Sequence, residues 1–205
     1  MSERPDRSAV VVCGGRSERF GERDKVFADL AGRPLVTHVL DRVAPVVEEV
    51  VVNCHPDQHD RMADAIDRPA TRLAVDDRPG EGPLAGLERG FEAANGRYAL
   101  AVACDMPFVD PAFVEVLFEQ ASRVEAAIPR QSGGWFQPLQ AVYAVDPLSR
   151  ALEDAATRGI SRPIEPARAL EHVIVWDVPE GDDGPDTLFN VNTPADLAAA
   201  EAALD

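Results

Sequence analysis

The chain has 205 residues, of which 45% are hydrophobic. This composition favours one globular domain over residues 1–205 and excludes a disordered chain. It carries 20 basic against 36 acidic residues, a formal net charge of −16, which argues against nucleic acid or a membrane surface as a partner. No apolar run approaches the roughly 20 residues that span a bilayer. The polar start of the chain does not resemble a signal peptide, so we expect a cytoplasmic protein.

Nineteen of the 20 basic residues are arginine, and the single lysine is Lys25. An acidic surface with almost no lysine fits a protein that works in concentrated salt. A codon bias toward arginine explains the same composition, and the two explanations are compatible. In either case the chain has kept one compact ammonium group, at position 25.

Short β-branched runs alternate with amphipathic stretches along the chain. The pattern predicts strands at 8–13, 49–54, 71–75, 98–104, 125–129, 139–145 and 172–178, and helices at 34–46, 57–67, 83–95, 111–122, 147–158, 162–170 and 194–204. We expect Gly96 to end the third helix, Pro111 to begin the fourth and Thr193 to cap the last. Continuous apolar strands between helices indicate a three-layer, Rossmann-like α/β fold, with a mostly parallel sheet and helices on both faces.

Ligands of such sheets bind at the carboxyl ends of the strands. The loop after the first strand joins a glycine pair to four cations: Gly14, Gly15, Arg16, Arg19, Arg23 and Lys25. Free backbone N–H groups and cations suit a phosphate, and the alternative is a solvent-exposed turn. The loop has neither the G-x-G-x-x-G spacing of dinucleotide-binding proteins nor the Walker pattern of P-loop NTPases.

Carboxylates follow the third and fourth strands. Asp105 directly follows an apolar strand and suits Mg²⁺ at the mouth of the sheet. The alternative role, a helix cap, fits Asp110 better. Asp76 ends the third strand, whereas Asp77 is interpreted as part of a solvated turn. Asn53 has the chemistry to contact a base or ribose, but by itself it is better explained as a turn residue.

Other reactive residue types give weaker signals. The three cysteines, Cys13, Cys54 and Cys104, each end a predicted strand, and packing explains them better than a metal or redox cluster. The histidines have no ligand spacing, and no nucleophile motif is present. Residues 130–140, which include Trp135 and Phe136, form either an insertion that frames a pocket or only a hairpin.

Several segments together resemble the nucleotidyltransferases related to molybdenum cofactor guanylyltransferase. The stretch from Val12 to Lys25, VCGGRSERFGERDK, is similar to the family pattern L-A-G-G-x-S-x-R-M-G-x-x-D-K, with Cys13 in place of alanine and Phe20 in place of methionine. The likeness continues in order through GRPL at 32–35, VN at 52–53, GPLAG at 82–86, CDMP at 104–107 and NVNTP at 190–194. Residues 131–145 match least.

The resemblance implies a Mg²⁺-dependent enzyme with a nucleotide-diphospho-sugar transferase-like fold. It implies transfer of a nucleoside monophosphate to a phosphorylated acceptor. For the most similar members the donor is GTP and the acceptor is molybdopterin, with transient contact to molybdoenzyme-maturation proteins. The nucleotide-binding residues that it implies are Val12, Cys13, Gly14, Gly15, Lys25, Asn53, Asp76 and Asp105, with Asp105 also the metal ligand.

The expected chemistry agrees with these residue types. In-line attack on the α-phosphorus spreads negative charge over the phosphate oxygens. Mg²⁺ on Asp105 would bridge the phosphates, while Lys25 and Arg19 would stabilise the departing pyrophosphate. Two alternatives stay open: a related transferase that uses a sugar, corrinoid or phospholactate acceptor, and a nucleotide-binding regulator without catalytic activity.

Overall fold

The structure, a computed structural model, describes residues 6–13, 24–66, 68–78, 80, 82–131, 133–178 and 187–204. Within these ranges no helix is long and apolar enough to cross a membrane. The glycines and arginines of the predicted phosphate loop, from Gly14 to Arg23, lie outside the described residues.

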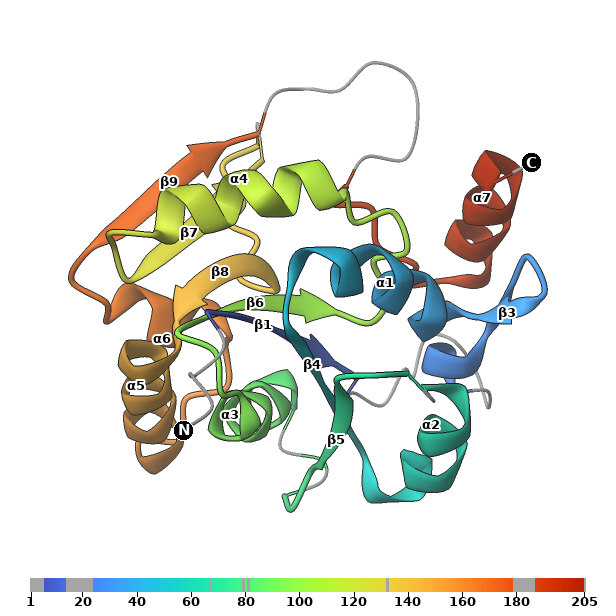
Figure 1. The fold of residues 1–205 in the computed structure, drawn as a ribbon, viewed down its shortest axis with the longest axis horizontal. Coiled ribbons are helices and arrows are strands. Elements are labelled where there is room, and N and C mark those ends of the chain that lie inside the picture. Colours follow the sequence, from blue (N-terminus) through green and yellow to red (C-terminus); the bar gives the residue numbers. More distant parts are fainter. Residues whose placement is uncertain are drawn as a thin grey trace.

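A mixed sheet runs through the middle of the molecule (Figure 1). Its strands are β1 (Arg7–Val12), β4 (Glu49–Cys54), β5 (Thr71–Val75), β6 (Tyr98–Ala103), β7 (Ala126–Arg130), β8 (Gln140–Ala144) and β9 (Val173–Asp177). Their order in space is β5-β4-β1-β6-β8-β7-β9. Neighbouring strands pair in parallel except at β8, which is antiparallel to β6 and β7. The prediction of a mostly parallel sheet is confirmed.

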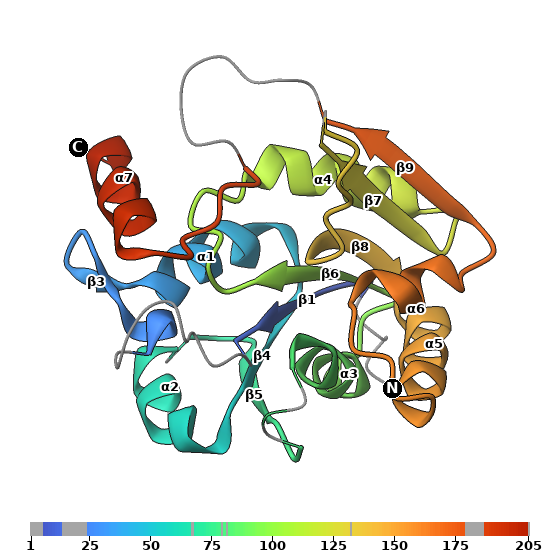
Figure 2. The same ribbon diagram turned by 180° about the vertical axis from the view of Figure 1, so that it is seen from behind.

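Helices cover both faces of the sheet, as the two opposite views show (Figures 1 and 2). One face carries α1 (Leu35–Val43), α2 (His59–Ala65) and α4 (Pro111–Ala121). The other carries α3 (Pro83–Ala93), α5 (Val145–Thr157) and α6 (Ile164–Arg168). The predicted three-layer arrangement is therefore present.

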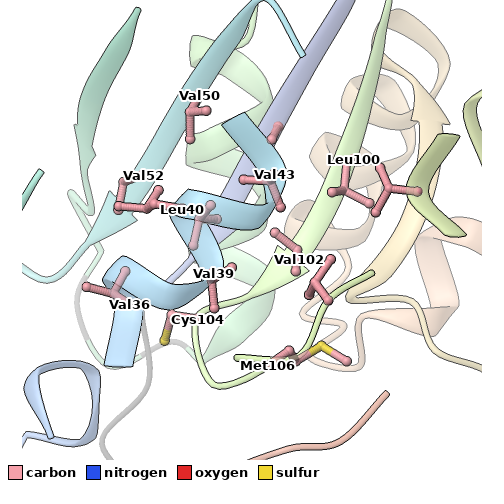
Figure 3. Close-up of a cluster of buried hydrophobic side chains, with 14 of the residues drawn as sticks. Val36, Val39, Leu40, Val43, Val50, Val52, Leu100, Val102, Cys104 and Met106 are labelled. Atoms are coloured by element: carbon pink, nitrogen blue, oxygen red, sulfur yellow. The ribbon is translucent and has the colours of Figure 1, made fainter. Parts of the chain in front are cut away.

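Alternating side chains of the central strands build the two cores. In β1, Ala9 and Val11 pack with the α1 layer, whereas Val10 and Val12 pack with the α3 layer. In the first core, apolar residues at helical spacing on α1 lie over β4 and β6 (Figure 3): Val36, Val39, Leu40 and Val43. Because both faces of β1 are buried, the strand is apolar from Ala9 to Val12, which is the pattern that predicts a central parallel strand.

A smaller unit lies beside the main sheet. Its hairpin consists of β2 (Asp29–Leu30) and β3 (Arg33–Pro34), and α7 (Pro194–Leu204) lies next to it (Figure 1). Leu30, Val191 and Ala200 share a buried cluster there. The end of the described chain is thus anchored close to residues that follow Lys25.

Two local features differ from the sequence-based expectation. Helix α3 ends at Ala93 with an extended Ala94, so Gly96 is not its cap. Instead, a Cβ at Gly96 would lie 2.4 Å from Ser8 Oγ, and glycine is required by that close approach. The sequence also does not predict the β2–β3 hairpin, because two-residue strands are too short to show an alternating pattern.

Candidate functional site

The carboxyl ends of β5, β4, β1 and β6 lie along one edge of the sheet because these four strands are parallel neighbours. Backbone hydrogen bonds extend the pairing beyond the strands. The Cys13 N–H donates to the Asn53 carbonyl at 3.1 Å, and the Cys104 N–H donates to the Val12 carbonyl at 3.2 Å. The residues that follow each strand are therefore gathered along this edge, as the topology predicts.

Lys25 and Asp105 meet at this edge. Lys25 Nζ lies 2.6 Å from Asp105 Oδ2, and each side chain is only 13% exposed. Lys25 begins the short 3-10 helix η2 (Lys25–Phe27), which Asp24 caps by accepting the Val26 N–H at 3.3 Å. Val26 is buried in the core and fixes this turn. The structure thus brings the only lysine of the sequence to the carboxylate that follows β6.

The segment 187–193, here called the strap, also reaches the pair. The Val191 N–H donates to the backbone carbonyl of Asp105 at 2.8 Å. Lys25 Nζ donates to Asn192 Oδ1 at 3.2 Å, across 167 residues of sequence. Asn192 is not among the site residues predicted from the sequence, although it lies in the NVNTP segment of the family resemblance. The NVNTP segment is the sequence feature from which a role of Asn192 could have been predicted.

Reciprocal hydrogen bonds at the start of α7 hold Asn192 in position. Asp196 Oδ2 accepts the N–H groups of Asn192 and Thr193 at 2.9 and 2.8 Å, and the Asp196 N–H donates to Thr193 Oγ1 at 3.2 Å. The Asn192 N–H above all holds the pKa of Asp196 below its usual value. The predicted cap by Thr193 is confirmed, and it forms one half of a capping box.

The other end of the strap is attached to β8 and α4. Thr187 Oγ1 accepts the side-chain amide of Gln140 at 2.6 Å and the Asp110 N–H at 2.9 Å. Gln140 is fully buried and begins β8, beside the end of β6. Asp110 in turn caps α4 by accepting the Ala112 N–H at 2.9 Å, as expected. The strap therefore joins the Gln140 side of the edge to the Lys25 side.

The second carboxylate oxygen of Asp105, Oδ1, is buried and has no hydrogen-bond partner within the described ranges. An unpartnered buried carboxylate oxygen is costly, and a bound cation would relieve that cost. The described residues contain no group of three or more His, Cys, Asp or Glu that could hold a metal ion. Mg²⁺ is usually bound through one or two carboxylates together with waters and substrate phosphates. Asp105 fits a Mg²⁺ ion of that kind.

Asn53 lies within β4 and is fully buried, so its interpretation as a turn residue is wrong. Its Nδ2 donates to the Ala74 carbonyl at 3.2 Å, and its Oδ1 is a buried acceptor without a partner in the described part of the chain. The side chain points at α3, where a Cβ on Gly86 would lie 2.3 Å from Oδ1. Glycine at position 86 thus makes room for the Asn53 amide. A contact between Asn53 and a nucleoside remains a prediction, and it requires this side chain to be uncovered.

Asp76 is buried at the end of β5, whereas Asp77 is exposed as expected. The Asp76 side chain accepts the Arg78 N–H at 3.0 Å. The predicted start of α3 is confirmed, because Gly82 precedes it with a φ of +88° and Pro83 is its first residue. Asp76 is thus held at the edge between β5 and α3, and its contact with a nucleoside remains a prediction.

The three cysteines are buried free thiols that pack in the same core. By the strand pairing, Cys13 lies between Cys54 on β4 and Cys104 after β6. Burial, together with the nearby Cys104, raises the pKa of Cys13 well above its usual value, and burial raises the pKa of Cys54 to about 11. Thiols held neutral in this way are weak nucleophiles, which supports the packing interpretation.

The region between β7 and β8 is a hairpin, one of the two forms left open by the sequence. The Gln131 N–H donates to the Trp135 carbonyl at 2.9 Å, and Arg130 pairs with Phe136. Gly134 takes a φ of +81° in the turn. Trp135 is 74% exposed, so within the described residues it is not part of a covered pocket.

The chain is similar to known proteins over most of its length. Residues 9–173 match the MobA-like NTP transferase domain. A "probable molybdenum cofactor guanylyltransferase" from Natronomonas pharaonis is 40% identical over 200 residues, which are 97% of this chain and 98% of that protein. The crystal structure of molybdopterin-guanine dinucleotide biosynthesis protein A from Archaeoglobus fulgidus is 27% identical, with a TM-score of 0.74 over 96% of this chain and 97% of that one.

A third likeness concerns the fold alone. The 2-C-methyl-D-erythritol 4-phosphate cytidylyltransferase from Thermus thermophilus is 23% identical, with a TM-score of 0.72 over 96% of this chain and 98% of that one. It confirms the expected nucleotide-diphospho-sugar transferase-like architecture. With the domain match and the nearly full-length relative, the comparisons agree with the resemblance seen in the sequence. The chain therefore belongs to the MobA-like NTP transferase family.

Proposed function

We propose that this chain transfers the GMP moiety of GTP to the phosphate of molybdopterin and releases pyrophosphate. The nearly full-length similarity to a molybdenum cofactor guanylyltransferase supports both the donor and the acceptor. The observation that carries the proposal is the meeting of Lys25 and Asp105, at 2.6 Å, on the ligand-binding edge of the sheet. Transfer at a triphosphate needs a cation and a metal ligand at one place, because positioning and charge neutralisation provide most of the catalysis.

In the proposed reaction an oxygen of the acceptor phosphate attacks the α-phosphorus of GTP. The bond from that phosphorus to the oxygen that bridges to the β-phosphate breaks, and pyrophosphate leaves. Lys25 binds the departing phosphates, and Arg19, which lies outside the described residues, assists it. Asp105 would hold Mg²⁺ through Oδ1, and the bound ion would supply charge neutralisation on the phosphate oxygens. No residue of the chain has to act as a general base, because the acceptor phosphate is already ionised.

The remaining site residues are proposed to bind the nucleotide, with Asn53 and Asp76 at its nucleoside. Val12, Cys13, Gly14 and Gly15 would bind through backbone groups, and the two glycines lie outside the described residues. Asn53 and Asp76 bring oxygen acceptors to the same edge, and the guanine edge presents N–H donors that such acceptors recognise. After transfer, the product dinucleotide would pass to molybdoenzyme-maturation proteins in a transient contact.

The test is a pyrophosphate-release assay with molybdopterin and Mg²⁺, given GTP, ATP or CTP in turn. We expect the guanine dinucleotide to form with GTP alone. Product from a sugar phosphate, a corrinoid phosphate or a phospholactate, but not from molybdopterin, would refute the acceptor. Binding of GTP without any turnover would refute the enzyme in favour of a regulator.

Two variants make this test specific. Lys25→Ala should lower turnover by roughly 10²–10³-fold, as expected for a group that stabilises charge in the transition state. Arg158→Ala is the control, because it removes a cation from an exposed ion pair with Asp154 on α5, at 3.0 Å. It should leave turnover unchanged.

A further inference from the structure

The Lys25 ammonium forms an ion pair with Asp105, the carboxylate that is proposed to bind Mg²⁺. One oxygen of Asp105 is engaged by Nζ at 2.6 Å, and the other is buried without a partner in the described part of the chain. Both side chains are only 13% exposed, so solvent screens this pair less than it screens a surface ion pair. In the nucleotide-free protein, the charge of Asp105 is thus already balanced by a cation that belongs to the chain.

A divalent cation at Asp105 would meet this ammonium across a single carboxyl group. The ammonium and the metal ion, bound to the two oxygens of one carboxylate, repel each other, and the repulsion is strong where water is largely excluded. A triphosphate removes the conflict, because its oxygens carry enough negative charge for both cations. The geometry therefore favours a metal ion that arrives together with the nucleotide over one that binds alone.

We propose that Lys25 guards Asp105 in the nucleotide-free protein, opposing uptake of a free divalent cation, and moves from the carboxylate to the triphosphate when metal and nucleotide arrive together. The inference rests on the proposed function for its ligand. It adds an order of events to that function and gives Lys25 a task before chemistry begins.

The surroundings of Lys25 suit such a transfer. An ammonium group has three donors on a flexible stem. Two of the donors are used here, one on Asp105 and one on Asn192 Oδ1 at 3.2 Å. Asn192 is held by the cap of α7, so it can keep the ammonium at the edge when the bond to Asp105 breaks.

This role also accounts for a lysine at position 25 in a chain whose other 19 basic residues are arginine. A guanidinium binds a carboxylate with two parallel hydrogen bonds and would engage both oxygens of Asp105. It would close the site that the metal needs and would be slow to leave. A lysine binds one oxygen and leaves Oδ1 available.

The test measures binding of Mn²⁺, as a probe for Mg²⁺, to the full-length protein without nucleotide, by the electron paramagnetic resonance signal of free Mn²⁺. Four proteins form a double-mutant cycle: wild type, Lys25→Met, Asp105→Asn and the double variant. We expect Lys25→Met to gain one Mn²⁺ site that is roughly tenfold tighter than any in the wild type. The Asp105→Asn change should abolish that site in the Lys25→Met background and alter nothing in the wild-type background. The comparison of wild type with Asp105→Asn also measures the Mn²⁺ ions that bind elsewhere on the acidic surface, so that these can be subtracted.

Adding a non-hydrolysable GTP analogue should give the wild type a tight Mn²⁺ site. Lys25→Arg should stay as weak as the wild type without nucleotide and should gain less than the wild type when the analogue is added. Melting curves establish that each variant is folded, and Lys25→Gln replaces Lys25→Met if the latter is not.

Equal Mn²⁺ affinity in wild type and Lys25→Met, or a wild-type site that Asp105→Asn already removes, would overturn the inference. Neither result touches the proposed function, which is lost only if the wild type fails to form the guanine dinucleotide.

Discussion

Replacing Gly86 with alanine tests whether the close approach of α3 to β4 controls nucleotide binding. A Cβ at this position would lie 2.3 Å from Asn53 Oδ1 and 3.1 Å from Asn53 Cγ. Ordinary contacts between heavy atoms are about 3.5 Å. Either α3 moves away from the sheet by about 1 Å, or the Asn53 amide rotates and loses its 3.2 Å bond to the Ala74 carbonyl.

The expected magnitude is a balance of two terms. Overpacking a tight interior contact costs about 1–3 kcal/mol, and the better helix propensity of alanine offsets up to about 1 kcal/mol. A net loss of about 1 kcal/mol lowers the melting temperature of a chain of this length by about 2–4 °C. If Asn53 binds the nucleoside as proposed, rotation of its amide would also break its hydrogen bond to the nucleoside. Losing that bond should raise the Kd for GTP by roughly five- to tenfold.

Gly90→Ala is the matched control. It lies on the same helix one turn later, and its Cβ would lie 2.3 Å from Val10 Cγ1, which belongs to the core and not to the proposed site. Thermal unfolding should show a similar loss of stability for both variants. Calorimetric GTP binding should be weakened in Gly86→Ala alone. Equal weakening in both variants, or an unchanged Gly86→Ala protein, would refute the link between this helix contact and the nucleoside.

The remaining predictions concern stability. Asp110→Ala removes the cap of α4 and should cost about 1 kcal/mol, or about 2–4 °C in melting temperature; an unchanged melting temperature would contradict the role of this bond. Since the folded-state pKa of Asp196 is lowered, its ionised form stabilises the fold above the unfolded-state pKa of about 4, and this contribution disappears as pH falls through the lower folded-state pKa. Acid unfolding should therefore be steeper in wild type than in Asp196→Asn, and parallel curves would exclude this role. The net charge of −16 predicts a melting temperature that rises with added KCl, by screening of like charges, and a falling one would refute that reading of the composition.

The sequence predicts the central strands well because both of their faces are buried. β4 begins and ends at the expected residues, since its three consecutive valines are buried between polar and turn residues. The edge strand β5, in which Arg72 is exposed, also has the expected bounds. The parallel order predicts that the residues after β1 and β6 share one edge of the sheet, and Lys25 and Asp105 meet there. The roles of these two residues in catalysis, the other site residues and the single-domain assignment stay predictions.

Other features depend on tertiary context that no local pattern carries. The direction of β8 cannot be read from an apolar run, because the run is the same for a parallel and an antiparallel neighbour. Asn53 resembles a turn residue until the glycine that faces it on α3 is known. The contact of Asn192 with Lys25 joins the two ends of the chain and leaves no periodic signal.

That last contact has a consequence for protein synthesis. A domain folds as a unit, once the ribosome has delivered the residues that its structure needs. The four parallel strands of the binding edge are complete by Ala103, but the amide partner of the ammonium emerges 167 residues after Lys25. The contact that holds Lys25 at the edge of the sheet can therefore form only after synthesis has passed Asn192. A fragment that ends before the strap lacks both this contact and the hydrogen bond from the Val191 N–H to the Asp105 carbonyl.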